Sequence, residues 1–190
     1  ELRYKNVAKE DDQLFEENVK KGENDRNICH LIREDKADEL ITLINQTKLS
    51  VRTLISTSQF ESNYYLIQNQ PTLLEYSAFY GSLQIFNNLR FSNFEVTSNC
   101  WLTAIHGRNT EFIPLLESLS IDPPQKTFVS CMTEIIKCHH NEYIETFRSN
   151  FISAPIDESD EIKYNTDIIS ALNLIILMHF FSILIMMKMF

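Results

Sequence analysis

Residues 71–89 constrain the fold of this chain more than any other stretch of its sequence. They read Pro-Thr-Leu-Leu-Glu-Tyr-Ser-Ala-Phe-Tyr-Gly-Ser-Leu-Gln-Ile-Phe-Asn-Asn-Leu. Thr72 is a good helix N-cap, and Glu75 three residues later completes a capping box. Gly81 suits a left-handed turn that ends a helix. An apolar stripe at helical spacing then restarts at Leu83, Phe86 and Leu89. The stretch therefore predicts two short antiparallel helices.

The same order of residue types recurs along the chain. The cap position holds residues that accept hydrogen bonds from the N–H groups of a first helical turn, namely Asn27, Thr72, Asn99 and Ser130. Apolar residues follow each of them at matching positions, and the separations are those of helical repeats, with one insertion. We therefore predict helix pairs at about 27–46, 72–91, 99–118 and 130–150, with the insertion at 47–70.

The pattern resembles the ankyrin repeat, whose signature is Thr-Pro-Leu-His, paired alanines, Gly-His-x-Glu and paired leucines. The matching residues are Thr72, Leu74, Ala78, Gly81, Gln84, Ile85, Phe86, Leu89, Ala104, Glu111, Leu115 and Leu116. Glu75 departs from the signature by replacing its histidine, and Arg108 and His139 stand where Gly81 stands. Three phrases, Tyr-Ser-Ala-Phe-Tyr-Gly-Ser, Trp-Leu-x-Ala-Ile-His-Gly-Arg-Asn and Ile-Lys-Cys-His-His-Asn, resemble a divergent ankyrin-repeat family that is expanded in parasitic protists and has an uncharacterised leading domain.

The resemblance covers residues 26–152 and implies an all-α solenoid of ankyrin-like helix-turn-helix units with shortened inter-repeat hairpins. It also implies a scaffold that binds a protein partner through its concave face and loops. Phe79 and Tyr80 close the first helix of the best-matching repeat, at an edge that borders the concave face in such stacks. Arg108 lies at a helix end, where it either donates to a partner carboxylate or caps the preceding helix carbonyls. These three are the candidate partner-binding residues.

The remaining segments are assigned by composition. Residues 1–25 are charged, and we expect them to form one exposed helix. Within the insertion, Ser58 and Glu61 predict a capping box and a helix at about 59–69, and a shorter helix is expected near 51–56. Residues 153–166 read as an acidic linker.

Charge and cysteine content limit the function classes. A net charge of −9 argues against nucleic-acid binding, because phosphate contacts need clustered Lys and Arg. The cysteines, Cys29, Cys100, Cys131 and Cys138, show no disulfide-framework spacing. We interpret the first three as reduced core residues of a cytoplasmic domain.

Neither a metal site nor catalysis is predicted. Cys138, His139 and His140 are adjacent ligand types, but Cys131 lies about 10 Å further along a helix, too far to share a tetrahedral ion. We interpret the three as a polar turn and expect no metal and no cofactor. The sequence has no Gly-x-Ser-x-Gly, and we expect the repeat geometry to bring no cysteine and histidine together. An enzyme is therefore the disfavoured alternative.

Residues 167–190 form the final segment, within which residues 168–187 carry no charge. A bilayer-spanning helix needs about twenty residues. Apolar residues surround this helix, although His179 near its centre is a cost. We favour a transmembrane tail anchor, which would make the protein a membrane-tethered adaptor. A buried cap on the last helix pair and an incidental chain end are the alternatives.

Overall fold

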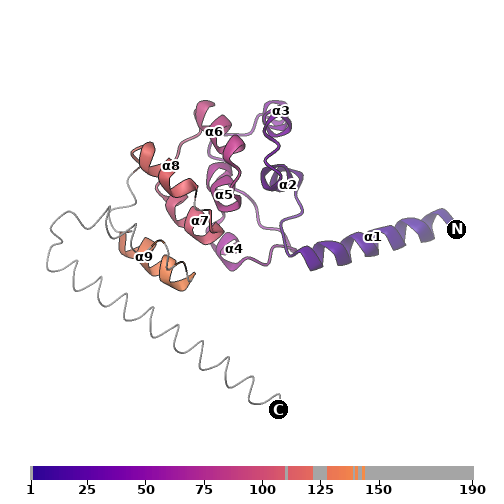
Figure 1. Ribbon diagram of the computed structural model, residues 1–190. Coiled ribbons are helices and arrows are strands. Elements are labelled where there is room, and N and C mark those ends of the chain that lie inside the picture. The colour runs from indigo at the N-terminus through magenta and orange to yellow at the C-terminus, as the bar shows by residue number, and fades with distance from the viewer. Residues whose placement is uncertain (1, 110, 122–127, 139, 141–142, 144–190) are drawn as a thin grey trace, which may run out of the picture. The chain divides into compact units, whose positions relative to one another are not determined.

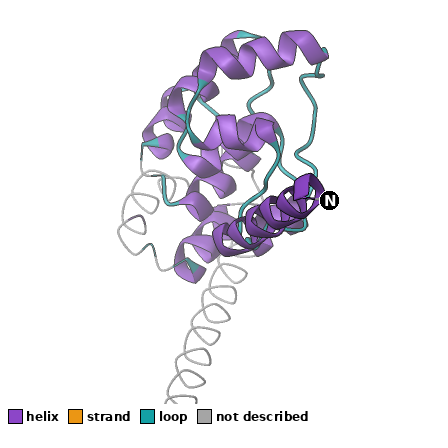
Figure 2. Cartoon of the chain, turned by 90° about the vertical axis from the view of Figure 1, so that its right-hand side faces the viewer, coloured by secondary structure: helices purple, strands orange, loops and turns teal. Residues whose placement is uncertain are grey.

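The computed structural model of the chain describes residues 2–109, 111–121, 128–138, 140 and 143. These residues form helices joined by loops, with no strand among them (Figure 2). The described part of the chain is therefore all-α, as predicted. The chain divides between Val96 and Thr97 into two compact units.

Six helices belong to the first unit (Figure 1). They are α1 (Leu2–Lys21), α2 (Asn27–Arg33), α3 (Ala37–Thr47), α4 (Tyr64–Asn69), α5 (Leu73–Tyr80) and α6 (Leu83–Phe91). Helix α5 packs against α2 and α6, and α3 packs against α6. Every residue of α5 from Leu73 to Phe79 is buried. Helix α5 is therefore the core of this unit, which explains why the sequence signal was strongest there.

The two ends of α5 are the ones that the sequence predicts. The backbone N–H of Glu75 donates to Thr72 Oγ1 at 3.2 Å, and the N–H of Thr72 donates to Glu75 Oε2 at 2.8 Å. Gly81 ends the helix in the left-handed conformation, with φ 77°. Both the capping box and the glycine turn are confirmed.

Hydrogen bonds to the preceding helix pair stabilise the start of α6. Asp35 lies in the turn between α2 and α3, and its two carboxylate oxygens accept from Gln84 N at 3.1 Å and Ile85 N at 2.9 Å. The Ser82 hydroxyl donates to the carbonyl of Ile32. Two side chains therefore tie the α2–α3 turn to the start of α6.

The other predicted caps are wrong. Asn27 and Asn99 are the first residues of α2 and α7, and neither helix has a side-chain cap. Backbone carbonyls satisfy the first-turn N–H groups instead: Cys29 N donates to Arg26 O at 2.9 Å, and Trp101 N donates to Ser98 O at 3.1 Å. Ser130 lies inside α9 (Phe128–Lys137), because that helix is already formed two residues earlier.

Asn24 orders the entry into α2. By composition it belongs to the predicted charged N-terminal segment, residues 1–25. It is 1% exposed. Its Oδ1 accepts from Arg26 N at 3.2 Å, and its Nδ2 donates to Ser56 O at 2.9 Å. Asn24 therefore links the entry to α2 with the inserted loop.

The insertion also differs from its prediction. Helix α4 begins at Tyr64, later than expected, because Asn63 rather than Ser58 caps it by accepting from Leu66 N at 3.2 Å. Glu61 Oε1 accepts from Asn63 N at 2.8 Å, so it is not part of a capping box at Ser58. No helix forms near 51–56, where Leu54 instead makes an isolated antiparallel bridge with Thr72.

The second unit contains α7 (Asn99–Gly107), α8 (Phe112–Ser118) and α9 among its described residues. Helix α7 packs against α8 and α9. Trp101, Phe112 and Leu116 are fully buried, and Trp101 Nε1 donates to Ile121 O at 2.9 Å. Trp101 is therefore a core residue of this unit.

Three predicted features lie outside the described residues. They are the second helix of the 130–150 pair, the linker at 153–166 and the apolar helix within 167–190. Within the described ranges, no helix is both long enough and apolar enough to span a bilayer.

Candidate interaction site

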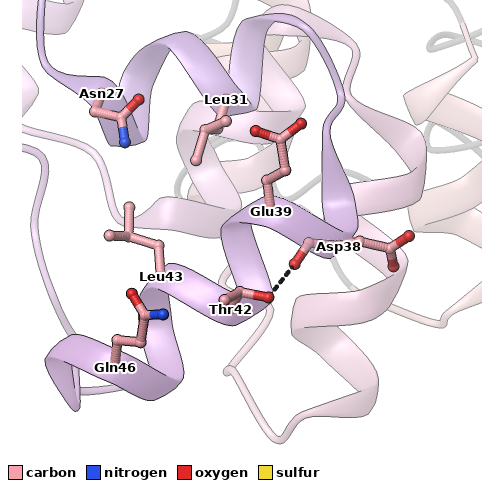
Figure 3. A pocket seen from close by; sticks show the side chains of 7 residues that line it. All are labelled: Asn27, Leu31, Asp38, Glu39, Thr42, Leu43 and Gln46. Carbon is pink, nitrogen blue, oxygen red and sulfur yellow. Dashed lines mark hydrogen bonds between the residues drawn. The ribbon is translucent and has the colours of Figure 1, made fainter.

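A groove of about 390 Å³ runs between α2 and α3 in the first unit (Figure 3). Its lining comes from α2, with Asn27 and Leu31, and from α3, with Asp38, Glu39, Thr42, Leu43 and Gln46. Leu31 and Leu43 supply apolar surface from opposite helices, as Figure 3 shows. The groove therefore combines an apolar floor with polar and acidic groups.

The charge of this groove is negative. Asp38 and Glu39 stand in the first turn of α3, where carboxylates interact favourably with the helix dipole, and both are exposed. No lining residue is basic. The Thr42 hydroxyl donates to the backbone carbonyl of Asp38 at 2.9 Å rather than to its carboxylate. The two acids are therefore open to a cationic ligand from solvent.

A second hollow, of about 460 Å³, adjoins the first and shares Asp38 and Thr42 with it. Ile41, Asn88, Phe91 and Ser92 complete its lining, so it lies between α3 and α6. Phe91 is 74% exposed, and the Arg90 guanidinium lies 4.5 Å from the centre of its ring. We call the two hollows together the α3 surface, which offers two acids beside an exposed aromatic ring.

The structure places the predicted residues Phe79 and Tyr80 in an aromatic cluster within the first unit. Phe79 is 9% exposed and stacks on Tyr65, with ring centres 6.4 Å apart. The Tyr80 ring lies 5.0 Å from that of Phe79 and 4.8 Å from that of Tyr76. Both residues therefore pack against neighbouring rings, and only Tyr80 retains appreciable exposure.

Arg33 anchors the polar side of this aromatic cluster. Its Nη1 donates to Tyr76 Oη at 3.1 Å and to the carbonyl of Asn24 at 2.9 Å, while its Nε lies 3.0 Å from Glu23 Oε2. Its guanidinium carbon also lies 5.8 Å from the centre of the Tyr80 ring. Sequence reasoning missed Arg33, since no local motif marks a residue whose contacts come from distant segments.

Arg108, the third predicted residue, ends α7 in the left-handed conformation with φ 60°. Its Nη2 donates to the carbonyl of Cys138 at 3.1 Å. This carbonyl follows α9 and does not belong to the preceding helix, so the contact is not the capping weighed from the sequence. The role as donor to a partner carboxylate stays a prediction. The guanidinium itself remains exposed.

Cys29, Cys100 and Cys131 are fully buried, as expected for core residues. Burial raises the pKa of the Cys29 thiol to about 11 and that of Cys131 to about 12. These two thiols therefore stay protonated near neutral pH and are poor nucleophiles.

The expectation that no cysteine and histidine come together is wrong. Cys138 Sγ lies 3.6 Å from His106 Nδ1, and His106 Nε2 lies 3.0 Å from Glu134 Oε2. Burial lowers the pKa of His106, but its contacts with Cys138 and Glu134 outweigh burial and place the pKa at about 9. The pair forms because α7 packs against α9, a contact that the predicted repeat geometry did not include.

The chain matches no protein-family model, no curated protein and no solved structure.

Proposed function

We propose that the chain is a protein-interaction module whose α3 surface binds a partner segment carrying basic and apolar side chains. The observation that carries the proposal is that Asp38 lines one hollow with the exposed ring of Phe91 and the adjoining hollow with Glu39. Buried aromatic rings supply much of the energy of protein interfaces, and complementary charges orient the partner and speed its association. The net charge of −9 favours the same class of partner over the whole chain.

The helix pairs α2–α3 and α5–α6 support a scaffold of the ankyrin type. Within each pair a short turn joins the two helices, and across the insertion α2 packs on α5 while α3 packs on α6. Stacking of equivalent helices between successive pairs is how helical repeats build a continuous binding surface. The proposal therefore keeps the ankyrin-like solenoid and places its binding surface where α3 and α6 adjoin.

The test uses synthetic peptides that alternate Lys or Arg with Leu, measured by fluorescence anisotropy against the full chain. Asp38→Asn combined with Glu39→Gln should weaken binding about tenfold, equivalent to about 1.4 kcal/mol. Higher salt should reduce the difference, because exposed charges are screened. Length-matched peptides with Glu in place of Lys should not bind.

Glu95→Gln is the matched control, because Glu95 is an exposed acid of the same unit outside the α3 surface. It should leave peptide affinity unchanged. The double variant removes two charges and the control one, so a loss of binding free energy in the control half as large as that in the double variant would show that only overall charge matters. Binding that is insensitive to both would exclude the α3 surface.

A further inference from the structure

Two helices of the second unit bring together three side chains of metal-ligand type. His106 stands in the last turn of α7, Glu134 lies within α9, and Cys138 directly follows α9. Glu134 and Cys138 are four residues apart, a spacing that puts side chains on the same face of a helix. One ligand atom from each of the three residues lies within 4.8 Å of the others.

The separation of the sulfur and the nitrogen already suits a tetrahedral ion. Zn²⁺ binds cysteine sulfur at about 2.3 Å and histidine nitrogen at about 2.0–2.1 Å, which places two such ligands about 3.6 Å apart in a tetrahedron. Cys138 Sγ lies 3.6 Å from His106 Nδ1. An ion can therefore sit between these two atoms without any movement of α7 against α9.

Glu134 is the third donor. Its Oε2 lies 3.0 Å from His106 Nε2, and its Oε1 lies 2.8 Å from Lys137 Nζ. As positioned, the carboxylate contacts the other ring nitrogen of His106, so an oxygen reaches an ion at Nδ1 only through a change of the Glu134 rotamer. Mixed sulfur, nitrogen and oxygen ligands suit Zn²⁺ and Co²⁺ better than Ca²⁺ or Mg²⁺, which prefer oxygen alone.

We propose that Cys138, His106 and Glu134 bind one Zn²⁺ ion, with a fourth position open to water or an external donor. The ion would connect α7 to α9 and so stabilise the second unit. This proposal departs from the sequence-based expectation of no metal, which considered Cys138 with His139, His140 and Cys131 but not with His106 or Glu134. It does not depend on the proposed interaction function, since it concerns the other unit.

A second histidine–carboxylate pair provides the internal comparison. His30 Nε2 lies 3.3 Å from Glu34 Oε1, but no cysteine belongs to that pair, and its side chains are 53% and 41% exposed. The corresponding values for His106 and Glu134 are 17% and 20%. The thiol and the greater burial distinguish the proposed site from an ordinary surface pair.

The experiment titrates the metal-free full chain with Co²⁺ and then displaces the cobalt with Zn²⁺. We expect one equivalent of Co²⁺ per chain, a thiolate-to-cobalt charge-transfer absorption, and loss of that absorption when Zn²⁺ is added. A correctly folded wild-type chain that shows no such absorption would overturn the proposal, whatever the variants do.

Variants then assign the ligands. Cys138→Ser should abolish the charge-transfer absorption, and His106→Gln and Glu134→Gln should each weaken Co²⁺ binding by about a hundredfold, at the upper end of the effects seen for residues that only orient a ligand. His30→Gln and His139→Ala should leave binding unchanged. An absorption that persists in Cys138→Ser, or that is lost in either control, would show that the ion binds elsewhere.

Discussion

Helices α5 and α7 lie in different units, and although the sequence predicts a side-chain cap at the start of both, only α5 has one. Thr72 and Glu75 form a full capping box at the start of α5, whereas Asn99 provides no cap to α7. Gly81 ends α5 in a left-handed conformation, and Arg108 adopts the same conformation at the end of α7. The comparison shows that a helix of this kind can form with locally favourable end residues, as in α5, or without them, as in α7.

The largest expected effect concerns the separate cores of the two units. Leu89 of α6 and Leu116 of α8 are both fully buried. Leu89→Ala and Leu116→Ala should each lower the free energy of unfolding by about 2–5 kcal/mol, through lost apolar contacts and a residual cavity. Urea titration measures both. The fluorescence of Trp101, the single tryptophan, follows the second unit.

Phe91→Ala is the control for these truncations, because Phe91 is 74% exposed. It should change the free energy of unfolding by less than about 0.5 kcal/mol. A Trp101 transition that does not move in Leu116→Ala would contradict the packing of α7 against α8.

The helix ends come next in size. Gly81→Ala should cost roughly 1 kcal/mol, because a left-handed conformation strains any residue with a Cβ atom. Arg108→Gly should relieve that strain at the end of α7, offset by the lost hydrogen bond to Cys138 O and by greater freedom of the unfolded chain. In thermal melts we therefore expect the melting temperature of Gly81→Ala to fall and that of Arg108→Gly to rise or stay unchanged. A clear loss of stability in Arg108→Gly would mean that its capping contact outweighs the strain.

The helix starts give the smallest effects. Thr72→Ala should destabilise the chain by about 1 kcal/mol, since Glu75 N loses its acceptor. Asn99→Ala should stay within about 0.5 kcal/mol, because backbone carbonyls already accept from the first-turn N–H groups of α7. Equal costs for the two substitutions, measured by urea titration, would break the comparison between α5 and α7.

These differences also show how far the sequence predicts the structure. The capping box and the glycine turn of α5 depend on residues within one or two turns of each other, so the sequence predicts them. The sequence does not predict the entry to α2, because there Asn24 contacts Ser56, which lies 32 positions away. The pattern predicted a side-chain cap at Asn27, whereas the structure orders the entry to α2 through Asn24, whose Oδ1 accepts from Arg26 N before the helix begins.

The candidate sites follow the same division. The acids Asp38 and Glu39 are visible in the sequence, but the position of Asp38 beside Phe91 requires α3 to pack on α6. The cluster of His106, Glu134 and Cys138 left one local signal, the four-residue spacing of the last two. His106 itself lies 32 positions before Cys138, and no helical period brings it there.

The carboxylate of Asp35 also sets an order of events in the folding of the first unit. It accepts from Gln84 N and Ile85 N, which lie 49 and 50 positions later in the chain. A helix as short as α6 has marginal stability by itself. Its first turn is therefore stable only after Asp35, in the α2–α3 turn, has come into contact with it. Contacts this distant in sequence form slowly, because the intervening loop must close first. In pulsed hydrogen exchange, the amides of Gln84 and Ile85 should therefore gain protection later than those of α5.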